Sequence, residues 1–389
     1  MIAKLKRFDW VMLVTMLALM ALGTMAIRSA GLARAESVFH GVWVSNVVTA
    51  TVGLVLYAVL AFSDYRKYLN LVAAPAYAAA LVFLVAVLVF GSTVYGGRRW
   101  LWFFQPSEIA KLCVIALLAV LLGDLKPDSR RRGFIGFSLA AVVVGVPLVL
   151  ILAEPDLGTA LTLVPATLLM MFVAGVWRKG LLALVMLVGL AALTVLGAVY
   201  EAERPGVSAE RRERILRYVP LKDHQVRRVR VFLFPERDRQ GAGYNLRQAK
   251  ISIGSGGFSG KGLGRGETNH LKYLPQAISM NDFIFCVWAE EMGFVGSAAL
   301  LALFGLLLLS CCHAAAVTDD GRGRLLALGL ATLVFAHVYI NIAMAIGIVP
   351  ITGLPLPFIS SGRTFLVTVV CGLGLVQSVT IHRERIKYD

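Results

Sequence analysis

Ten apolar segments, each about as long as a membrane-spanning helix, dominate the 389-residue sequence. They cover about 9–29, 42–62, 71–91, 106–123, 133–153, 157–176, 181–200, 283–312, 325–348 and 356–380. About 20 apolar residues cross a bilayer as a helix, and these segments lack the alternation of a membrane β-barrel. The pattern predicts an all-α polytopic membrane protein with about ten transmembrane helices, in a single membrane domain over residues 1–389.

Composition excludes the main alternatives to a membrane protein. The chain is 58% hydrophobic and 16% charged, whereas a soluble domain carries roughly 25% charged residues. A net charge of +15 could indicate nucleic-acid binding, but most basic residues lie in short clusters between apolar segments. We therefore expect no nucleic-acid partner. The five cysteines lie in or beside apolar segments without metal-site spacing, so we expect them to pack as small hydrophobic residues.

The distribution of lysine and arginine predicts the orientation. With the N-terminus inside, the short inside segments carry sixteen of these residues and the short outside segments carry five, which favours two cytoplasmic termini. Helices 1–7 would occupy about 9–200 and helices 8–10 about 283–380. A large extracytoplasmic loop, about 201–281, would join them with a net charge of +8. Such a basic loop suggests an anionic lipid headgroup or pyrophosphate as ligand; a solvated charged loop is the alternative.

Charged residues within the apolar segments are the sharpest functional signal, because a charge at the bilayer centre costs on the order of 2.5–3.5 kcal/mol. Pro106 and Ser107 suit a helix start, and Glu108 then lies in the first turn. Lys111 lies about one turn deeper on the same face. Two interpretations stay open: a local Glu108–Lys111 ion pair, or a cationic phosphate-binding site with Arg99 above it.

Two further carboxylates lie at predicted outer helix ends. Asp156 could cap the following helix, or pair with Lys111 or Arg99 across a central cavity. Asp282 directly precedes the eighth apolar segment. It could cap that helix or, if partly desolvated, act as a general base with a raised pKa.

Three other motifs carry weaker signals. The Pro- and Gly-broken stretch 353–363 enters the last span, and broken backbone at membrane depth normally lines a cavity, so Arg363 is a candidate phosphate contact or ion-pair partner. The stretch 254–266 holds seven glycines but no P-loop spacing, which favours a tightly turned or flexible loop beside a large substrate. Glu290 and Glu291 would need a basic partner, most simply from another helix.

Taken in order, these motifs resemble the SEDS family of bacterial cell-envelope proteins, which includes RodA, FtsW and SpoVE. The resemblance covers nearly the whole chain, and the PLPF stretch at 355–358 is most similar to the elongation branch, RodA. The chain departs from the family pattern at Gln276, where Glu is usual, and at 360–363, where Ser-Tyr-Gly-Gly is usual. The motifs that carry the resemblance are Arg99-Trp100, Gln105–Leu112 (QPSEIAKL), Glu154–Leu161 (EPDLGTAL), Gly241–Tyr244, Ile253–Leu263 (IGSGGFSGKGL), Asp282–Phe285, Ala289–Gly293 and Pro350–Ser360 (PITGLPLPFIS).

The resemblance implies a SEDS fold, similar to GT-C glycosyltransferases, in the bacterial inner membrane with its active face extracytoplasmic. It implies a peptidoglycan glycosyltransferase that polymerises lipid II, the undecaprenyl-pyrophosphate-linked disaccharide peptide, during cell-wall elongation and cell-shape maintenance. It also implies a class B penicillin-binding protein as partner within the elongation or division complex. The family's essential acid falls on Asp282, its basic positions on Arg99, Lys111 and Arg228, and its other acids on Glu108 and Asp156.

We expect an inverting glycosyl transfer in which Asp282 takes the acceptor hydroxyl proton, or holds a divalent cation (Mg²⁺ or Mn²⁺) that helps to do so. Arg99, Lys111, Arg228 and Arg363 would stabilise the departing pyrophosphate. No other cofactor is expected. Three alternatives stay open: a division-type polymerase similar to FtsW, a non-catalytic scaffold for a transpeptidase, and a transporter of lipid-linked precursor.

Overall fold

The computed structural model describes residues 5–32, 41–94, 97–102, 104–125, 130–154, 156–219, 221–238, 240–267, 273–275 and 279–383. Within these ranges, nine helices are long and apolar enough to cross a membrane, and α7 is a shorter apolar helix. The predicted all-α polytopic fold is confirmed; one small hairpin, β1 (Ser92–Val94) with β2 (Gly97–Trp100), is added to it. The ten apolar helices are α2 (Trp10–Leu32), α3 (Val42–Phe62), α4 (Tyr65–Phe90), α5 (Pro106–Gly123), α6 (Arg130–Ala153), α7 (Leu157–Val173), α8 (Arg178–Ala202), α14 (Ile284–Val317), α15 (Gly321–Ile346) and α16 (Arg363–His382).

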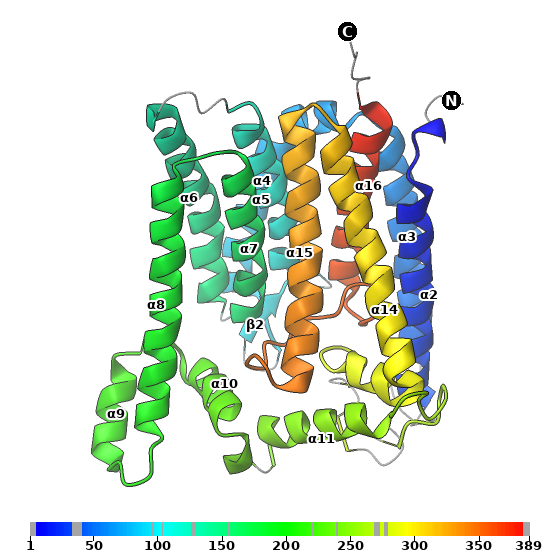
Figure 1. Ribbon diagram of the computed structural model, residues 1–389. Helices are drawn as coiled ribbons and strands as arrows, with labels where there is room; N and C mark the ends of the chain where they lie inside the picture. The colour runs from blue at the N-terminus through cyan, green and yellow to red at the C-terminus, as the bar shows by residue number, and fades with distance from the viewer. Residues whose placement is uncertain are drawn as a thin grey trace.

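The helices form a bundle with α5, α15 and α16 at its centre. Most residues in the apolar stretches of α15 and α16 are buried. In α8 only 6% of them are buried, and this helix stands at the edge of the bundle (Figure 1). Because α8 is apolar on all sides, it is suited to lipid contact along most of its length.

Two helices differ from the predicted segments for local reasons. The last segment begins at about 356 by hydropathy, but α16 begins at Arg363, because Pro355 and Pro357 interrupt the helix and 350–362 forms no helix. The eighth segment continues to Val317 as α14 and contains a kink at Gly293, whose φ is 65°.

The segment between α8 and α14 forms the predicted large loop. It contains α9 (Ala209–Arg217), α10 (Asp223–Leu233), a 3₁₀ turn at 235–237 and α11 (Ala242–Ser255), all at one end of the bundle (Figure 1). The start of α2 and the end of α16 lie at the opposite end (Figure 1).

The basic loop is held to the bundle by one buried carboxylate at the end of α8. Glu203 Oε1 forms ion pairs with Arg230 Nε at 2.7 Å and with Arg212 Nη2 at 2.9 Å. Its Oε2 pairs with Arg237 Nη1 at 3.3 Å. Part of the positive charge of the loop is therefore neutralised within the fold.

Candidate active site

Asp282 lies at the loop end of the bundle, one residue before the N-cap of α14. Phe283 takes the cap position, and no side chain caps the helix, so Asp282 is not an N-cap. Within the described residues its carboxylate makes no hydrogen bond or salt bridge, and the residue is partly buried. The carboxylate is therefore available to a bound molecule.

Arg228 of α10 approaches this carboxylate from the loop. Its Nη1 donates to the Thr352 carbonyl at 2.7 Å, which anchors α10 on the stretch before α16. Gly353 follows with a φ of +77°, and a Cβ placed there would lie 3.4 Å from Asp282 Oδ2 and 3.9 Å from Arg228 Nη2. The three residues thus meet at one point.

Burial and two guanidinium groups together set the protonation of this cluster. Burial raises the pKa of Asp282 to about 6, against the lowering effect of Arg228 and Arg99. Burial and the nearby charge of Arg99 lower the pKa of Arg228. A carboxyl group with a pKa of about 6 is mostly ionised near pH 7 and can then accept a proton.

The backbone around Asp282 is held by polar side chains that the sequence analysis did not single out. Asn341 of α15 is buried, and its Nδ2 donates to the carbonyls of Asp282 at 2.9 Å and Leu354 at 2.7 Å. Ser360 Oγ donates to the Asn281 carbonyl at 2.6 Å. A polar residue within an apolar stretch is a signal that the sequence offers for both residues. It does not reveal their partners, which are distant in the sequence.

Asp156 both caps α7 and pairs with Arg99, two of the roles that the sequence predicted for it. Its Oδ1 accepts the Thr159 amide at 3.2 Å, which caps α7, and lies 3.8 Å from Arg99 Nη1. Gln105 Nε2 donates to its Oδ2 at 2.9 Å. Asp156 therefore fixes Arg99 of β2 beside the start of α5.

The predicted ion pair between Glu108 and Lys111 is present. Lys111 Nζ lies 2.8 Å from Glu108 Oε2 and 2.8 Å from His337 Nε2, and it is fully buried. His337 stacks on Phe365, and its Nδ1 lies 3.3 Å from the Pro355 carbonyl. The cluster thus joins α5 and α15 to the stretch that carries Gly353, and a direct phosphate contact by Lys111 stays a prediction.

Arg363 is not brought to this cluster. Its side chain is exposed, and its Nη1 donates to Ser45 Oγ of α3 at 3.4 Å. Its role as a phosphate contact stays a prediction. Gln276, where the chain departs from the family pattern, lies outside the described residues.

The glycine-rich stretch is a tight turn packed on the kink of α14. A Cβ at Gly260, whose φ is +80°, would lie 2.2 Å from the Glu291 carbonyl. The Lys261 and Gly262 amides donate to the Glu290 and Glu291 carbonyls. Lys261 Nζ also pairs with Glu290 Oε1 at 2.9 Å, so the basic partner of Glu290 comes from this turn and not from another helix.

Glu154 is a buried carboxylate that the sequence analysis did not propose as a site residue. It is 0% exposed, and among the described residues neither carboxylate oxygen has a hydrogen-bond partner. Burial and the neighbouring charge of Asp156 raise its pKa to about 8, and Arg99 acts in the opposite direction. The sequence shows Glu154 two positions before Asp156. It does not show that, among the described residues, the Glu154 carboxylate has no hydrogen-bond partner.

The cluster holds one carboxylate, Asp282, on which the charges of Arg228 and Arg99 act. Among the residues that the structure describes, no group of three or more His, Cys, Asp or Glu is placed to hold a metal ion. The arrangement suits a base next to an anionic group, with guanidinium groups that stabilise developing negative charge.

The chain is similar to known proteins over almost its whole length. The family model for FtsW, RodA and SpoVE, described as cell cycle protein, matches residues 9–385. The chain belongs to this family. It is 35% identical over 382 residues to the peptidoglycan glycosyltransferase MrdB of Escherichia coli K12, covering 97% of this chain and 94% of that one. It is 31% identical to the peptidoglycan glycosyltransferase RodA of Treponema pallidum, covering 96% and 97%.

Solved structures of the family share the fold. A chain in a peptidoglycan synthase complex that coordinates polymerization and crosslinking matches with a TM-score of 0.76 and 32% identity, covering 97% of this chain and 99% of that one. The rod shape determining protein RodA of Thermus thermophilus matches with a TM-score of 0.68 and 29% identity, covering 97% and 98%.

Proposed function

We propose that this chain, a peptidoglycan glycosyltransferase of the SEDS family, polymerises lipid II with Asp282 as its base. The observation that carries the proposal is the Asp282 carboxylate, which has no protein partner in the described residues and lies beside Arg228 with a pKa of about 6. The similarity to RodA and MrdB proteins supports the elongation branch.

The proposed reaction is a single displacement with inversion. The 4-hydroxyl oxygen of the acceptor sugar forms a bond to the anomeric carbon of the donor, and the bond from that carbon to undecaprenyl pyrophosphate breaks. Asp282 takes the hydroxyl proton, and the pyrophosphate leaves with the electron pair. Arg228 and Arg99 stabilise the charge that develops on the leaving group.

The need for Mg²⁺ or Mn²⁺ stays a prediction. The neighbours of Asp282 that the structure describes are two arginines and not further carboxylates. This donor set does not fit a cation held by the protein alone, so the proposed mechanism contains no step through a metal.

The proposed orientation places both termini in the cytoplasm of the bacterial inner membrane and the Asp282 end outside. The excess of basic residues in the short segments at the end with the termini supports it. The proposed partner is a class B penicillin-binding protein, which would crosslink the product. A similar chain functions within a peptidoglycan synthase complex, which supports this partner.

The test is polymerisation of labelled lipid II by the purified full-length chain, with and without its cognate class B penicillin-binding protein, analysed as a glycan ladder on a gel. A ladder in either preparation supports the polymerase. Copurification of the two proteins without a ladder, under conditions in which a known relative polymerises, would instead favour the scaffold. Transport of labelled precursor across vesicles without a ladder would favour the transporter.

A further inference from the structure

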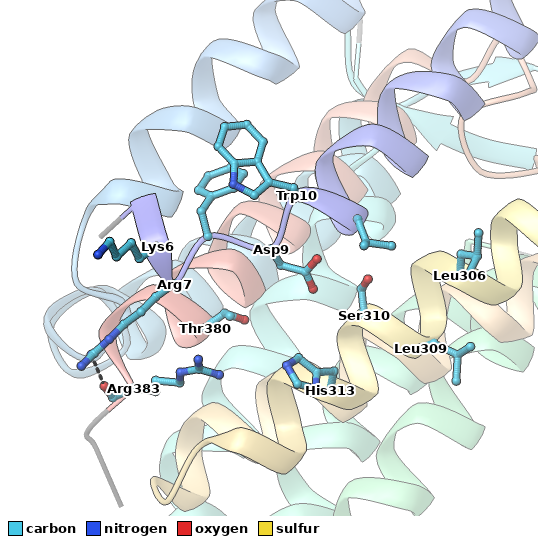
Figure 2. A pocket seen from close by; sticks show the side chains of 12 residues that line it. Lys6, Arg7, Asp9, Trp10, Leu306, Leu309, Ser310, His313, Thr380 and Arg383 are labelled. Atoms are coloured by element: carbon cyan, nitrogen blue, oxygen red, sulfur yellow. Dashed lines mark hydrogen bonds between the residues drawn. The ribbon is translucent and has the colours of Figure 1, made fainter. Parts of the chain in front are cut away.

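A pocket of about 540 Å³ lies at the end of the bundle opposite Asp282. Its walls come from the residues before α2, the first turn of α2, the last turns of α14 and the end of α16 (Figure 2). None of these elements contributes a residue to the candidate active site at this end. The pocket therefore needs an explanation of its own.

Positive charge exceeds negative charge in this pocket. Lys6, Arg7 and Arg383 line it, with Asp9 as the carboxylate among the lining residues. Arg7 Nη1 donates to the Arg383 carbonyl at 2.6 Å, and within the described residues no salt bridge involves any of the three cations. Asp9 Oδ1 accepts the Met12 amide at 3.0 Å at the start of α2. Among the described residues that line the pocket, three Lys and Arg cations thus face one carboxylate.

The same pocket is also lined by exposed apolar side chains. Trp10, Leu306 and Leu309 are 55%, 45% and 65% exposed, although all three lie in membrane-spanning helices. Figure 2 shows Leu306 and Leu309 along α14, with His313 further along the same helix, closer to Arg383. The pocket thus passes from a cationic rim to a surface that would face lipid tails.

We propose that this pocket binds an anionic phospholipid. Its phosphate would lie among Lys6, Arg7 and Arg383, and its acyl chains would lie against Leu306 and Leu309. Basic pockets between transmembrane helices at the membrane surface bind such headgroups, and tryptophan is typical of the headgroup level. Assignment to the cytoplasmic leaflet rests on the proposed orientation; the binding itself does not.

A membrane lipid fits this pocket better than free phosphate does. Free phosphate would satisfy the cations but would leave the exposed wall of Trp10, Leu306 and Leu309 uncovered. A lipid covers both surfaces and would join the two ends of the chain to α14.

The experiment compares two triple variants of the full-length protein. One variant removes the pocket cations, with Lys6→Gln, Arg7→Gln and Arg383→Gln. The matched control removes three exposed cations at the same end, with Lys67→Gln, Arg131→Gln and Lys179→Gln. Binding of phosphatidylglycerol, phosphatidylcholine and inorganic phosphate to detergent-purified protein is measured by native mass spectrometry.

We expect the pocket variant to bind phosphatidylglycerol at least about tenfold more weakly than wild type, and the control variant to bind it as wild type does. Phosphatidylcholine and inorganic phosphate should bind the wild type at least about tenfold more weakly than phosphatidylglycerol. A Leu306→Gln, Leu309→Gln variant, which keeps every cation, should also lose affinity. Equal losses in the two triple variants, or equal binding of the two lipids by wild type, would overturn the proposal. If the pocket triple variant does not fold, Arg383→Gln alone, compared with Lys179→Gln, decides in the same way.

Discussion

Asp282 and Arg228 face each other across Gly353, where a side chain would contact both groups. A Cβ at Gly353 would lie 3.4 Å from the Asp282 carboxylate and 3.9 Å from the Arg228 guanidinium, and the backbone there has a φ of +77°. This approach brings the loop helix α10, the start of α14 and the stretch before α16 to one place.

Gly353→Ala should therefore reduce polymerisation more than it reduces stability. The left-handed backbone costs an alanine on the order of 1 kcal/mol, and its methyl group would fill the space between base and guanidinium. We expect activity to fall at least about tenfold in the gel assay. Gly189→Ala on α8, which meets no atom within 4 Å, is the matched control and should keep full activity. Equal activity of the two variants would be inconsistent with this geometry.

The pH dependence of polymerisation should report Asp282. Since a general base must be ionised and its pKa is about 6, the rate should level off above about pH 7 and fall about tenfold per unit below pH 6. Arg228 lowers this pKa, so Arg228→Gln should move the midpoint to higher pH, whatever it does to the maximum rate. Arg227→Gln removes a neighbouring exposed arginine and should leave the midpoint in place. A midpoint that Arg228→Gln does not move would assign the profile to another group.

Lys111→Met should destabilise the bundle because it leaves the Glu108 carboxylate buried without its cation. Removal of one partner of a buried ion pair typically costs about 3–5 kcal/mol. The double variant Glu108→Gln, Lys111→Met should recover most of the loss in thermal stability, measured in detergent. Recovered stability with no recovered activity would show that the Lys111 charge also acts on substrate. A Lys111→Met protein as stable as wild type would contradict the structural role.

Glu154 should make the protein less stable as pH rises. Its pKa is raised from the ordinary 4.5 to about 8 in the fold, so the folded state holds a proton that the unfolded state releases between these values. Stability from this group is complete below about pH 4.5 and is lost as pH rises to about 8. Glu154→Gln should flatten the fall of Tm over this window, whereas Glu213→Gln, at an exposed position on α9, should not. A wild-type Tm that rises over the same window relative to Glu154→Gln would refute the assignment.

Much of the fold could be predicted because hydropathy is a local property. Ten segments of sufficient length predicted ten helices, and the net-basic loop before Asp282 was placed correctly between α8 and α14. The spacing of Glu108 and Lys111 predicted their ion pair, because residues three apart share one helix face.

What could not be predicted depends on contacts between distant segments. Nothing local indicates that Arg228 would bind the Thr352 carbonyl, or that Asn341 would hold the backbone of Asp282. Likewise, the need for glycine in the glycine-rich turn is explained only by the α14 backbone that the turn contacts. Arg363, a basic residue beside a broken helix, has its side chain at Ser45, and its predicted contact with phosphate stays a prediction.

The most direct test of the central claim is the yield of glycan polymer from Asp282→Asn with labelled lipid II and the partner protein, at a pH near 7.5. Asparagine keeps the size of the side chain but cannot accept the proton, so folding and copurification with the partner should be unchanged. We expect the ladder to be lost, with activity reduced by at least about 10²-fold. A ladder of wild-type strength from a folded Asp282→Asn protein would contradict the claim.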